Sequence, residues 1–268
     1  MTQIPPACFM HLMGGLGNQL FQIAITIAHC NRNGYTLAIS KSTQGGRPVY
    51  WDSFLHNLAQ YTVNSSNTRY NPWNEPHFHY SPIPAGAQSL YGYFQSSKYF
   101  ADAVVSSEIR RLFVPHPRII ATVNEKYSGV VTPHSVAVHV RRGDYLHDNS
   151  SMSYHFVTTP AYFERAVAKA RELDPSAEFV VFSEDTEWCR AQPYFAGATI
   201  IDEPDECLTL ELMSRFQHYI ISNSSFSWWA TWLGTPARTV LVPDRWFGPH
   251  GPQDYEDVYE PSWIRIPV

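Results

Sequence analysis

The sequence predicts an α/β protein with two halves, each built on a parallel sheet. Short apolar runs alternate with segments of helical periodicity through most of the 268 residues, which is the pattern of βα units. The length allows one large domain or two compact ones, and proline and glycine cluster between residues 114 and 134. We therefore expect a first domain over residues 1–125 and a second over residues 126–268. The two halves are expected to face each other across a central cleft, with a C-terminal tail that can pack back on the first.

In the first half, the expected elements follow one another closely. Asn18 is expected to cap a helix that has a continuous apolar face, because asparagine accepts hydrogen bonds from the first free amides of a helix. The predicted elements are a strand at residues 9–13, a helix from Asn18 to about Gly34 and a strand at residues 35–40. Residues 44–89 lose the pattern except at residues 51–61, and a stretch this long without regular structure indicates a functional or elaborated segment.

The second half returns to a regular alternation. Thr159 and Pro160 form a cap and first-turn pair, which marks the start of a helix. The predicted strands lie at residues 136–140, 179–183, 218–222 and 239–242, and the predicted helices at 160–173, 206–217 and 225–233. In parallel sheets of this kind, ligands bind at the carboxyl ends of the strands.

Charge and composition exclude several classes of protein. The chain has 19 Lys and Arg against 24 Asp and Glu, a net charge of −5, so it lacks the basic surface of a nucleic-acid-binding protein. No apolar run has the length of a transmembrane segment, and the N-terminal stretch lacks the basic residues of a signal peptide. The four cysteines have no paired spacing that would suggest a zinc site or a disulfide framework. We expect a cytoplasmic protein with reduced thiols, which could also associate with the inner membrane face.

The first candidate motif is GGLGNQLFQ, residues 14–22. Gly15 and Gly17 permit close approach of the backbone to a ligand, and the helix that follows offers free amides to an anion. Asn18 adds a polar side chain at the same place. The alternative is a tight turn without a ligand. The motif differs from the dinucleotide fingerprint and from the P-loop.

The second motif is HVRRGDY, residues 139–145, where a buried strand is predicted to end. Arginines near a core need an anionic partner, and a phosphate matches the guanidinium fork. His139, Arg141 and Arg142 are therefore candidate ligands for a phosphate. The alternatives are an ion pair of either arginine with Asp144, a solvated loop, or an adhesion tripeptide at residues 142–144.

The third motif is SNSSFSWWATWL, residues 222–233, again a strand followed by a helix. Ser224 and Ser225 can cap that helix, and its first amides, including those of Phe226 and Ser227, can bind an anion. The alternative is an ordinary serine cap followed by core tryptophans. With Arg141 in the same half, the cap provides a second anion-binding element, so a diphosphate is the expected ligand.

Two carboxylates follow the strand at residues 179–183. Asp185 could accept hydrogen bonds from a guanine edge or cap a helix, and both interpretations stay open. No Asp-x-Asp sequence is present, so we expect no metal ion at the diphosphate. Arginine and helix amides can perform the same electrostatic task.

Together these motifs resemble the bacterial and viral-type α-1,2-fucosyltransferases, glycosyltransferase family 11. The matching segments are GGLGNQLFQ, YWDSFLHNL (50–58), GYFQSSKYF (92–100), HVRRGDY, FSEDTEW (182–188), LELMSRFQHYIISNSSFSWWATWL (210–233) and PSWIRI (261–266). The resemblance implies a GT-B fold, GDP-β-L-fucose as donor, a galactose-terminated acceptor, inversion at the anomeric carbon and no metal. It places the nucleotide in the second half and the acceptor in the first. Glu184 departs from the aspartate that we expect at its position.

The resemblance also assigns roles to single residues. Arg141 is expected to contact the diphosphate and Asn18 to line the donor cleft, while Asp144 is the first candidate for the base. The expected catalytic residues are Arg141, Asp144 and Asn18, and the expected donor-binding residues are Gly15, Gly17, Asn18, His139, Arg141, Arg142, Asp185, Ser224, Ser225, Phe226 and Ser227. The alternatives are a GDP-sugar-dependent transferase with another acceptor linkage, a GDP-fucose hydrolase and a non-catalytic glycan-binding protein.

Overall fold

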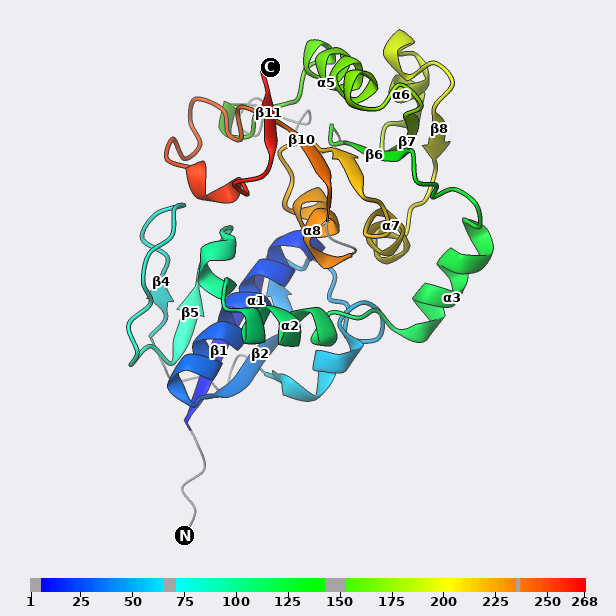
Figure 1. Ribbon diagram of the computed structural model, residues 1–268. Coiled ribbons are helices and arrows are strands. Elements are labelled where there is room, and N and C mark those ends of the chain that lie inside the picture. The colour runs from blue at the N-terminus through cyan, green and yellow to red at the C-terminus, as the bar shows by residue number, and fades with distance from the viewer. Residues whose placement is uncertain (1–5, 65–70, 143–152, 235–236) are drawn as a thin grey trace. The chain divides into compact units, whose positions relative to one another are not determined.

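The structure, a computed structural model, describes residues 6–64, 71–142, 153–234 and 237–268 and contains two compact units (Figure 1). Unit 1 comprises the chain up to residue 116 together with residues 254–259, and unit 2 comprises residues 117–253 and 260–268. Each unit contains one sheet in which all neighbouring strands are parallel. The predicted α/β class with two parallel-sheet halves is therefore confirmed. The acceptor and donor roles of the halves stay predictions.

Unit 1 has a five-stranded sheet in the order β3-β2-β1-β5-β4. Its strands are β1 (Ala7–Met13), β2 (Thr36–Gln44), β3 (Thr62–Val63), β4 (Trp73–Asn74) and β5 (Ser89–Tyr91), and its helices are α1 (Leu16–Asn33), α2 (Ala103–Leu112) and the 3₁₀ helices η1 (His56–Tyr61), η3 (Ser97–Phe100) and η6 (Glu256–Val258). The short strands β3, β4 and β5 were not predicted from the sequence. Two or three residues are too few to show an alternating pattern.

The central helix α1 begins earlier than predicted. Its N-cap is Gly15 with an extended backbone, and Gln19 N donates to the Gly15 carbonyl at 3.1 Å. Asn18 lies inside the first turn, so the prediction that it caps the helix is wrong. The physical reason is that its side-chain oxygen accepts a hydrogen bond from the Gln95 amide at 2.8 Å. Gly34 ends the helix in the left-handed conformation, φ 66°, near the predicted end.

Unit 2 has a six-stranded sheet in the order β11-β10-β9-β6-β7-β8. The strands are β6 (Ser135–Val140), β7 (Glu178–Ser183), β8 (Thr199–Ile201), β9 (His218–Ile220), β10 (Thr239–Pro243) and β11 (Ile264–Ile266). The helices are α3 (Pro117–Lys126), α5 (Pro160–Leu173), α6 (Thr186–Arg190), α7 (Glu206–Met213), α8 (Ser225–Leu233) and the 3₁₀ helix η5 (Pro193–Phe195). Among these, β8, β11, α3 and η5 were not predicted, and α6 was expected only as the helix that Asp185 could cap.

Helix α7 is shorter than the predicted helix at residues 206–217. The chain leaves the helix at Ser214, whose hydroxyl donates to the Glu211 carbonyl at 2.8 Å. The Tyr219 hydroxyl on β9 then donates to the Phe216 carbonyl at 2.8 Å and to the Met213 carbonyl at 3.0 Å. The turn thus satisfies its backbone through β9, which a local pattern does not reveal.

The strand β6 contacts helices on both faces of the sheet, because successive side chains point to opposite sides. Val136, Val138 and Val140 belong to the core cluster that contains the α5 residues Tyr162 and Phe163. The opposite face carries His139, whose ring lies 5.6 Å from that of Phe226 on α8. Figure 1 shows α5 on one side of this sheet and α7 and α8 on the other.

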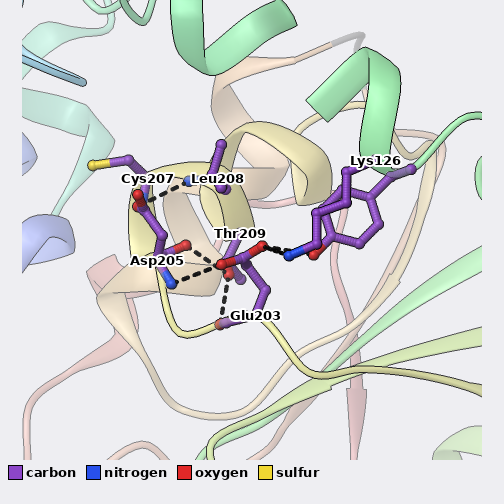
Figure 2. A network of polar contacts seen from close by, with 7 residues as sticks. Lys126, Glu203, Asp205, Cys207, Leu208 and Thr209 are labelled. Atoms are coloured by element: carbon purple, nitrogen blue, oxygen red, sulfur yellow. Dashed lines mark hydrogen bonds and ion pairs between the residues drawn. The ribbon is translucent and has the colours of Figure 1, made fainter. Parts of the chain in front are cut away.

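A polar network connects the end of helix α3 to the segment before α7 within unit 2 (Figure 2). Glu203 Oε2 accepts from Lys126 Nζ at 2.6 Å and from the Tyr127 hydroxyl at 2.7 Å, and the Glu203 side chain is only 4% exposed. Its second oxygen accepts from Asp205 N, and Asp205 in turn caps α7. The first helix after the unit boundary is therefore bound to α7.

Candidate active site

Three of the predicted motifs meet at one edge of the sheet of unit 2. Strand β6 lies between β9 and β7, and all three run parallel. Their carboxyl ends consequently lie side by side and lead into residues 141–142, 184–185 and 222–225. The sheet topology, rather than the chain order, brings these segments together.

The two arginines that follow β6 pair with the two carboxylates that follow β7. Arg141 Nη1 lies 3.4 Å from Glu184 Oε1, and Arg142 Nε lies 3.2 Å from Asp185 Oδ2. Both pairs continue the register in which Val140 faces Ser183. The sequence analysis considered only Asp144 as an acidic partner, and Asp144 lies outside the described residues.

The two arginine side chains differ in their exposure and in the lengths of their ion pairs with Glu184 and Asp185. The Arg142 guanidinium also lies 4.1 Å from the centre of the Trp188 ring, and its side chain is 17% exposed. The Arg141 side chain is 32% exposed and has the longer ion pair. Since its side chain is the more exposed of the two, Arg141 is the better placed to contact an incoming anion.

Ser222 joins the ends of β6 and β9. Its hydroxyl donates to the His139 carbonyl at 2.8 Å and accepts from Arg141 N at 3.0 Å. Neighbouring Asn223 donates through its amide to the carbonyls of Phe156 and Trp246, each at 2.7 Å. The sequence analysis did not identify these two residues, although two polar residues directly after a buried strand were a usable signal.

The N-terminus of α8 follows directly. Ser224 is the N-cap, and its hydroxyl accepts from Phe226 N at 3.3 Å, which confirms the predicted cap. The Ser227 hydroxyl is buried and donates to the Ser224 carbonyl at 3.2 Å. Trp228 and Trp229 are fully buried, as the core interpretation requires. The positive end of the helix dipole therefore lies beside the Arg141 backbone, which Ser222 connects to this turn.

His139 is a neutral histidine in this environment. Its side chain is 5% exposed, and its Nδ1 has no hydrogen-bond partner among the described residues. Burial and the nearby Arg141 charge lower the pKa of His139 to about 3. The ring can thus offer a hydrogen bond without adding charge to the site.

Asp185 has several partners of its own. Its Oδ1 accepts from Trp188 N at 3.2 Å, so the residue caps α6, while its Oδ2 pairs with Arg142. The N-cap interpretation is therefore realised in the structure. Contact with a guanine edge stays a prediction.

In unit 1, the side chains of the glycine-rich motif have separate functions. Gln22 donates to and accepts from the Met13 backbone, at 3.2 and 3.0 Å, and Gln19 donates to the carbonyls of Gly14 and Pro48 at 3.0 and 2.8 Å. Gly14 has φ 76°, and a Cβ there would lie 2.4 Å from Asn18 Nδ2. The two glutamines therefore build the turn.

Gly15, Gly17 and Asn18 of the same turn differ in their surroundings. A Cβ added to Gly15 would meet no atom of the described residues within 4 Å, apart from its chain neighbours. Gly17 is buried in α1, and Asn18 is partly exposed. That these residues of unit 1 share a donor site with the motifs of unit 2 stays a prediction.

The described residues contain neither a cluster of metal ligands nor a helix that could cross a membrane. Within residues 6–64, 71–142, 153–234 and 237–268, no group of three or more His, Cys, Asp and Glu side chains is placed to hold a metal ion. Over the same ranges, no helix is both long and apolar enough to cross a membrane.

The chain is similar in sequence to known glycosyltransferases. The chain is 29% identical over 187 residues to an alpha-1,2-colitosyltransferase of Escherichia coli, covering 68% of this chain but only 63% of that protein. It is 27% identical over 276 residues to the galactoside 2-alpha-L-fucosyltransferase Sec1 of Mus musculus, covering 96% of this chain and 73% of that protein.

Solved structures match the fold. The crystal structure of NodZ alpha-1,6-fucosyltransferase soaked with GDP-fucose superposes with a TM-score of 0.56 at 14% identity, over 89% of this chain and 95% of that one. The fold is thus that of GT-B fucosyltransferases, as expected. The sequence profile of glycosyl transferase family 11 matches residues 36–267, and the chain belongs to this family.

Proposed function

We propose that the protein transfers L-fucose from GDP-β-L-fucose to the 2-hydroxyl of a terminal galactose, with inversion at the anomeric carbon. Family membership and relatives named galactoside α-1,2-fucosyltransferases support this activity. The observation that carries it is the position of Arg141 beside the N-terminus of α8. These two anion-binding elements end adjacent strands, and Ser222 joins them.

The proposal assigns the donor to unit 2. Arg141 and the amide of Ser225 bind the diphosphate, with His139, Ser224, Phe226 and Ser227 around them; Ser224 N itself donates to the Ser222 carbonyl at 2.8 Å. Arg142, held by Asp185, keeps the end of β6 in place. Gly15, Gly17 and Asn18 of unit 1 are proposed donor-binding residues as well.

The proposed reaction is a single in-line displacement. The galactose oxygen forms a bond to the anomeric carbon of fucose while the bond to the diphosphate oxygen breaks, and the electron pair leaves with GDP. Arg141 and the α8 amides stabilise the charge that develops on the leaving group more than they stabilise the ground state. The acceptor proton passes to a base, for which Asp144 is our candidate.

We also propose that the reaction proceeds without a metal ion and that the protein acts in the cytoplasm. Charged and dipolar groups at the strand ends support the first point, because they can perform a metal's electrostatic role. The four cysteines, all buried thiols, are compatible with a reducing compartment.

The direct test is incubation with GDP-fucose and lactose, followed by determination of the new linkage by NMR. A product fucosylated at the 2-hydroxyl of galactose supports the proposal. A different linkage indicates another transferase, release of GDP and free fucose indicates a hydrolase, and binding of oligosaccharide without turnover of the donor indicates a glycan-binding protein.

A second donor deserves a place in the same assay. One of the E. coli relatives is named a colitosyltransferase, and colitose is fucose without its 3-hydroxyl. We propose comparing kcat/KM for GDP-fucose and GDP-colitose with one acceptor. A larger kcat/KM for GDP-colitose would identify colitose, and not fucose, as the transferred sugar. The assignment of the diphosphate site would be unchanged.

A further inference from the structure

A strained turn follows β5 in unit 1, within the GYFQSSKYF motif. Phe94 has φ 55°, and it is the single non-glycine residue with positive φ in the described ranges. A bulky side chain seldom adopts this conformation, so the surrounding structure must impose it. Such turns are found preferentially where a protein positions functional groups.

Glu75, the residue after β4, imposes the turn. Its Oε2 accepts from Tyr93 N at 2.7 Å and from Phe94 N at 3.0 Å, and its Oε1 also lies 3.0 Å from Phe94 N. The glycine at position 92 is needed for this approach, because a Cβ there would lie 2.4 Å from the Glu75 Cβ. The Trp73 ring stacks on Phe94 at 6.2 Å.

The far end of the turn reaches the glycine-rich motif. Gln95 is 8% exposed, and its amide donates to Asn18 Oδ1 at 2.8 Å. Glu75, the Phe94 backbone, Gln95 and Asn18 thus form a continuous series of contacts. It runs from the edge strand β4 to the first turn of α1.

We propose that Glu75 is a positioning residue of the transferase: by fixing the Phe94 turn, it holds Gln95 on Asn18 and so fixes the conformation of the Asn18 side chain, which the proposed function assigns to donor binding. This inference rests on the proposed function. Glu75 acts through Gln95 and does not itself contact the reacting atoms.

The charge on Glu75 gives the proposal a distinctive signature. Burial raises the pKa of this carboxyl to about 7, although the amides of Phe94 and Tyr93 act in the opposite direction. The phenol of Tyr99 also interacts with Glu75 and stays neutral in this range, because burial raises its pKa. Ionisation leaves both oxygens as strong acceptors, Oε2 for the Tyr93 and Phe94 amides and Oε1 for the Phe94 amide, so the turn is held most firmly above pH 7.

The first experiment compares Glu75→Gln, Glu75→Asp and the control Glu108→Gln. Glu108 is a carboxylate of the same unit whose hydrogen bond to Asn31 lies at the surface. We expect Glu75→Gln to lower kcat by about 10- to 100-fold, as for misplaced reacting groups, with the KM for acceptor nearly unchanged. Wild-type kcat should decrease as the pH falls below 7. The Glu75→Asp variant should show the same decrease, and the Glu75→Gln variant should not.

A second variant guards against misfolding. Gln95→Met removes the contact to Asn18 and leaves the carboxylate and its turn intact. If both residues act along one path, the double variant with Glu75→Gln is no slower than the slower single variant. If the fold-decrease in kcat of the double variant equals the product of the two single decreases, the proposal is overturned.

A readout independent of activity separates this inference from the function. The ¹⁵N chemical shift of the Gln95 side-chain amide should change with pH near 7 in the wild type, as Glu75 titrates, and should not change in Glu75→Gln. If the wild type is active and Glu75→Gln changes neither kcat nor the Gln95 amide signal, the positioning role alone is overturned. A wild type that transfers no sugar overturns the proposed function, and the positioning role with it.

Discussion

At the scale of single residues, the two neighbouring arginines have different tasks. Arg142 is fixed between Asp185 and Trp188, whereas Arg141 has a longer ion pair and a more exposed side chain. A guanidinium that is already paired on two sides stabilises the strand end, and one with remaining exposure can bind a ligand. We therefore expect their substitutions to affect different measured properties.

Arg141→Ala should remove a charged contact to the departing diphosphate. We expect kcat/KM to fall by the equivalent of about 2 to 4 kcal/mol, as when one donor to a developing anion is deleted, with little change in unfolding temperature. Steady-state kinetics with GDP-fucose measures this. Arg165→Ala on α5, where the guanidinium donates to the Pro267 carbonyl at the surface, is the control, and turnover of Arg141→Ala equal to this control would contradict the assignment.

His139 makes the fold sensitive to acid. Because its folded-state pKa is about 3, against about 6.5 in an unfolded chain, the unfolded state binds the extra proton first. Stability therefore falls as pH drops from about 6.5 toward 3, by at most about 1.4 kcal/mol per pH unit for this group. Denaturant unfolding across this range should show a shallower loss for His139→Phe, and parallel curves for the two proteins would exclude a buried neutral histidine.

Several residue assignments could be made from the sequence, and others could not. The positions of Arg141 and Ser224 follow from local patterns, a strand end and a helix cap. The partners of the arginines do not, since Glu184 reaches Arg141 only through the register of two strands that α5 separates along the chain. Asn18 was misjudged as a cap because the competing contact with Gln95 is 77 residues away.

At the scale of elements, long patterns were predicted and short ones were missed. The strands β6 and β7 and the helix α5 have clear periodicity and lie where expected. The two-residue strands β3 and β4 exist because β2 and β5 offer them hydrogen-bonding partners. Their formation is a tertiary effect, and propensity alone does not encode it.

Helix α8 offers a test in which stability and binding separate. Ser224→Ala should lower the unfolding free energy by about 1 kcal/mol through loss of the cap and weaken GDP binding. Ser224→Asp should restore the cap and the stability, yet weaken GDP binding further, because a carboxylate repels the phosphates. Thermal unfolding and calorimetric titration with GDP measure both, and tighter GDP binding by Ser224→Asp would count against an anion site at this helix.

At the scale of the whole molecule, the two units contain different proposed functional groups. Unit 2 gathers the cationic and dipolar groups at the ends of β6 and β9, and unit 1 contains the Glu75 turn that leads to Asn18. The break in the pattern predicts a domain boundary at residues 125/126, which stays a prediction, whereas the first continuous stretch of unit 1 ends at residue 116. Residues 254–259 belong to unit 1 through contacts such as that of Tyr80 N with Asp257 at 2.7 Å.

Removal of divalent ions tests how the complete protein neutralises the diphosphate. We expect transferase activity to persist in excess EDTA, because arginine and helix amides replace the metal. A loss of activity that Mn²⁺ restores would show that an ion is required. Activity should instead fall with rising salt, since added ions screen charged contacts that are partly exposed to solvent.

The most direct measurement is a crystal structure of the full chain with bound GDP. We predict that the β-phosphate lies within hydrogen-bonding distance of the Arg141 guanidinium and of the first amides of α8. A nucleotide whose phosphates contact neither group would contradict it.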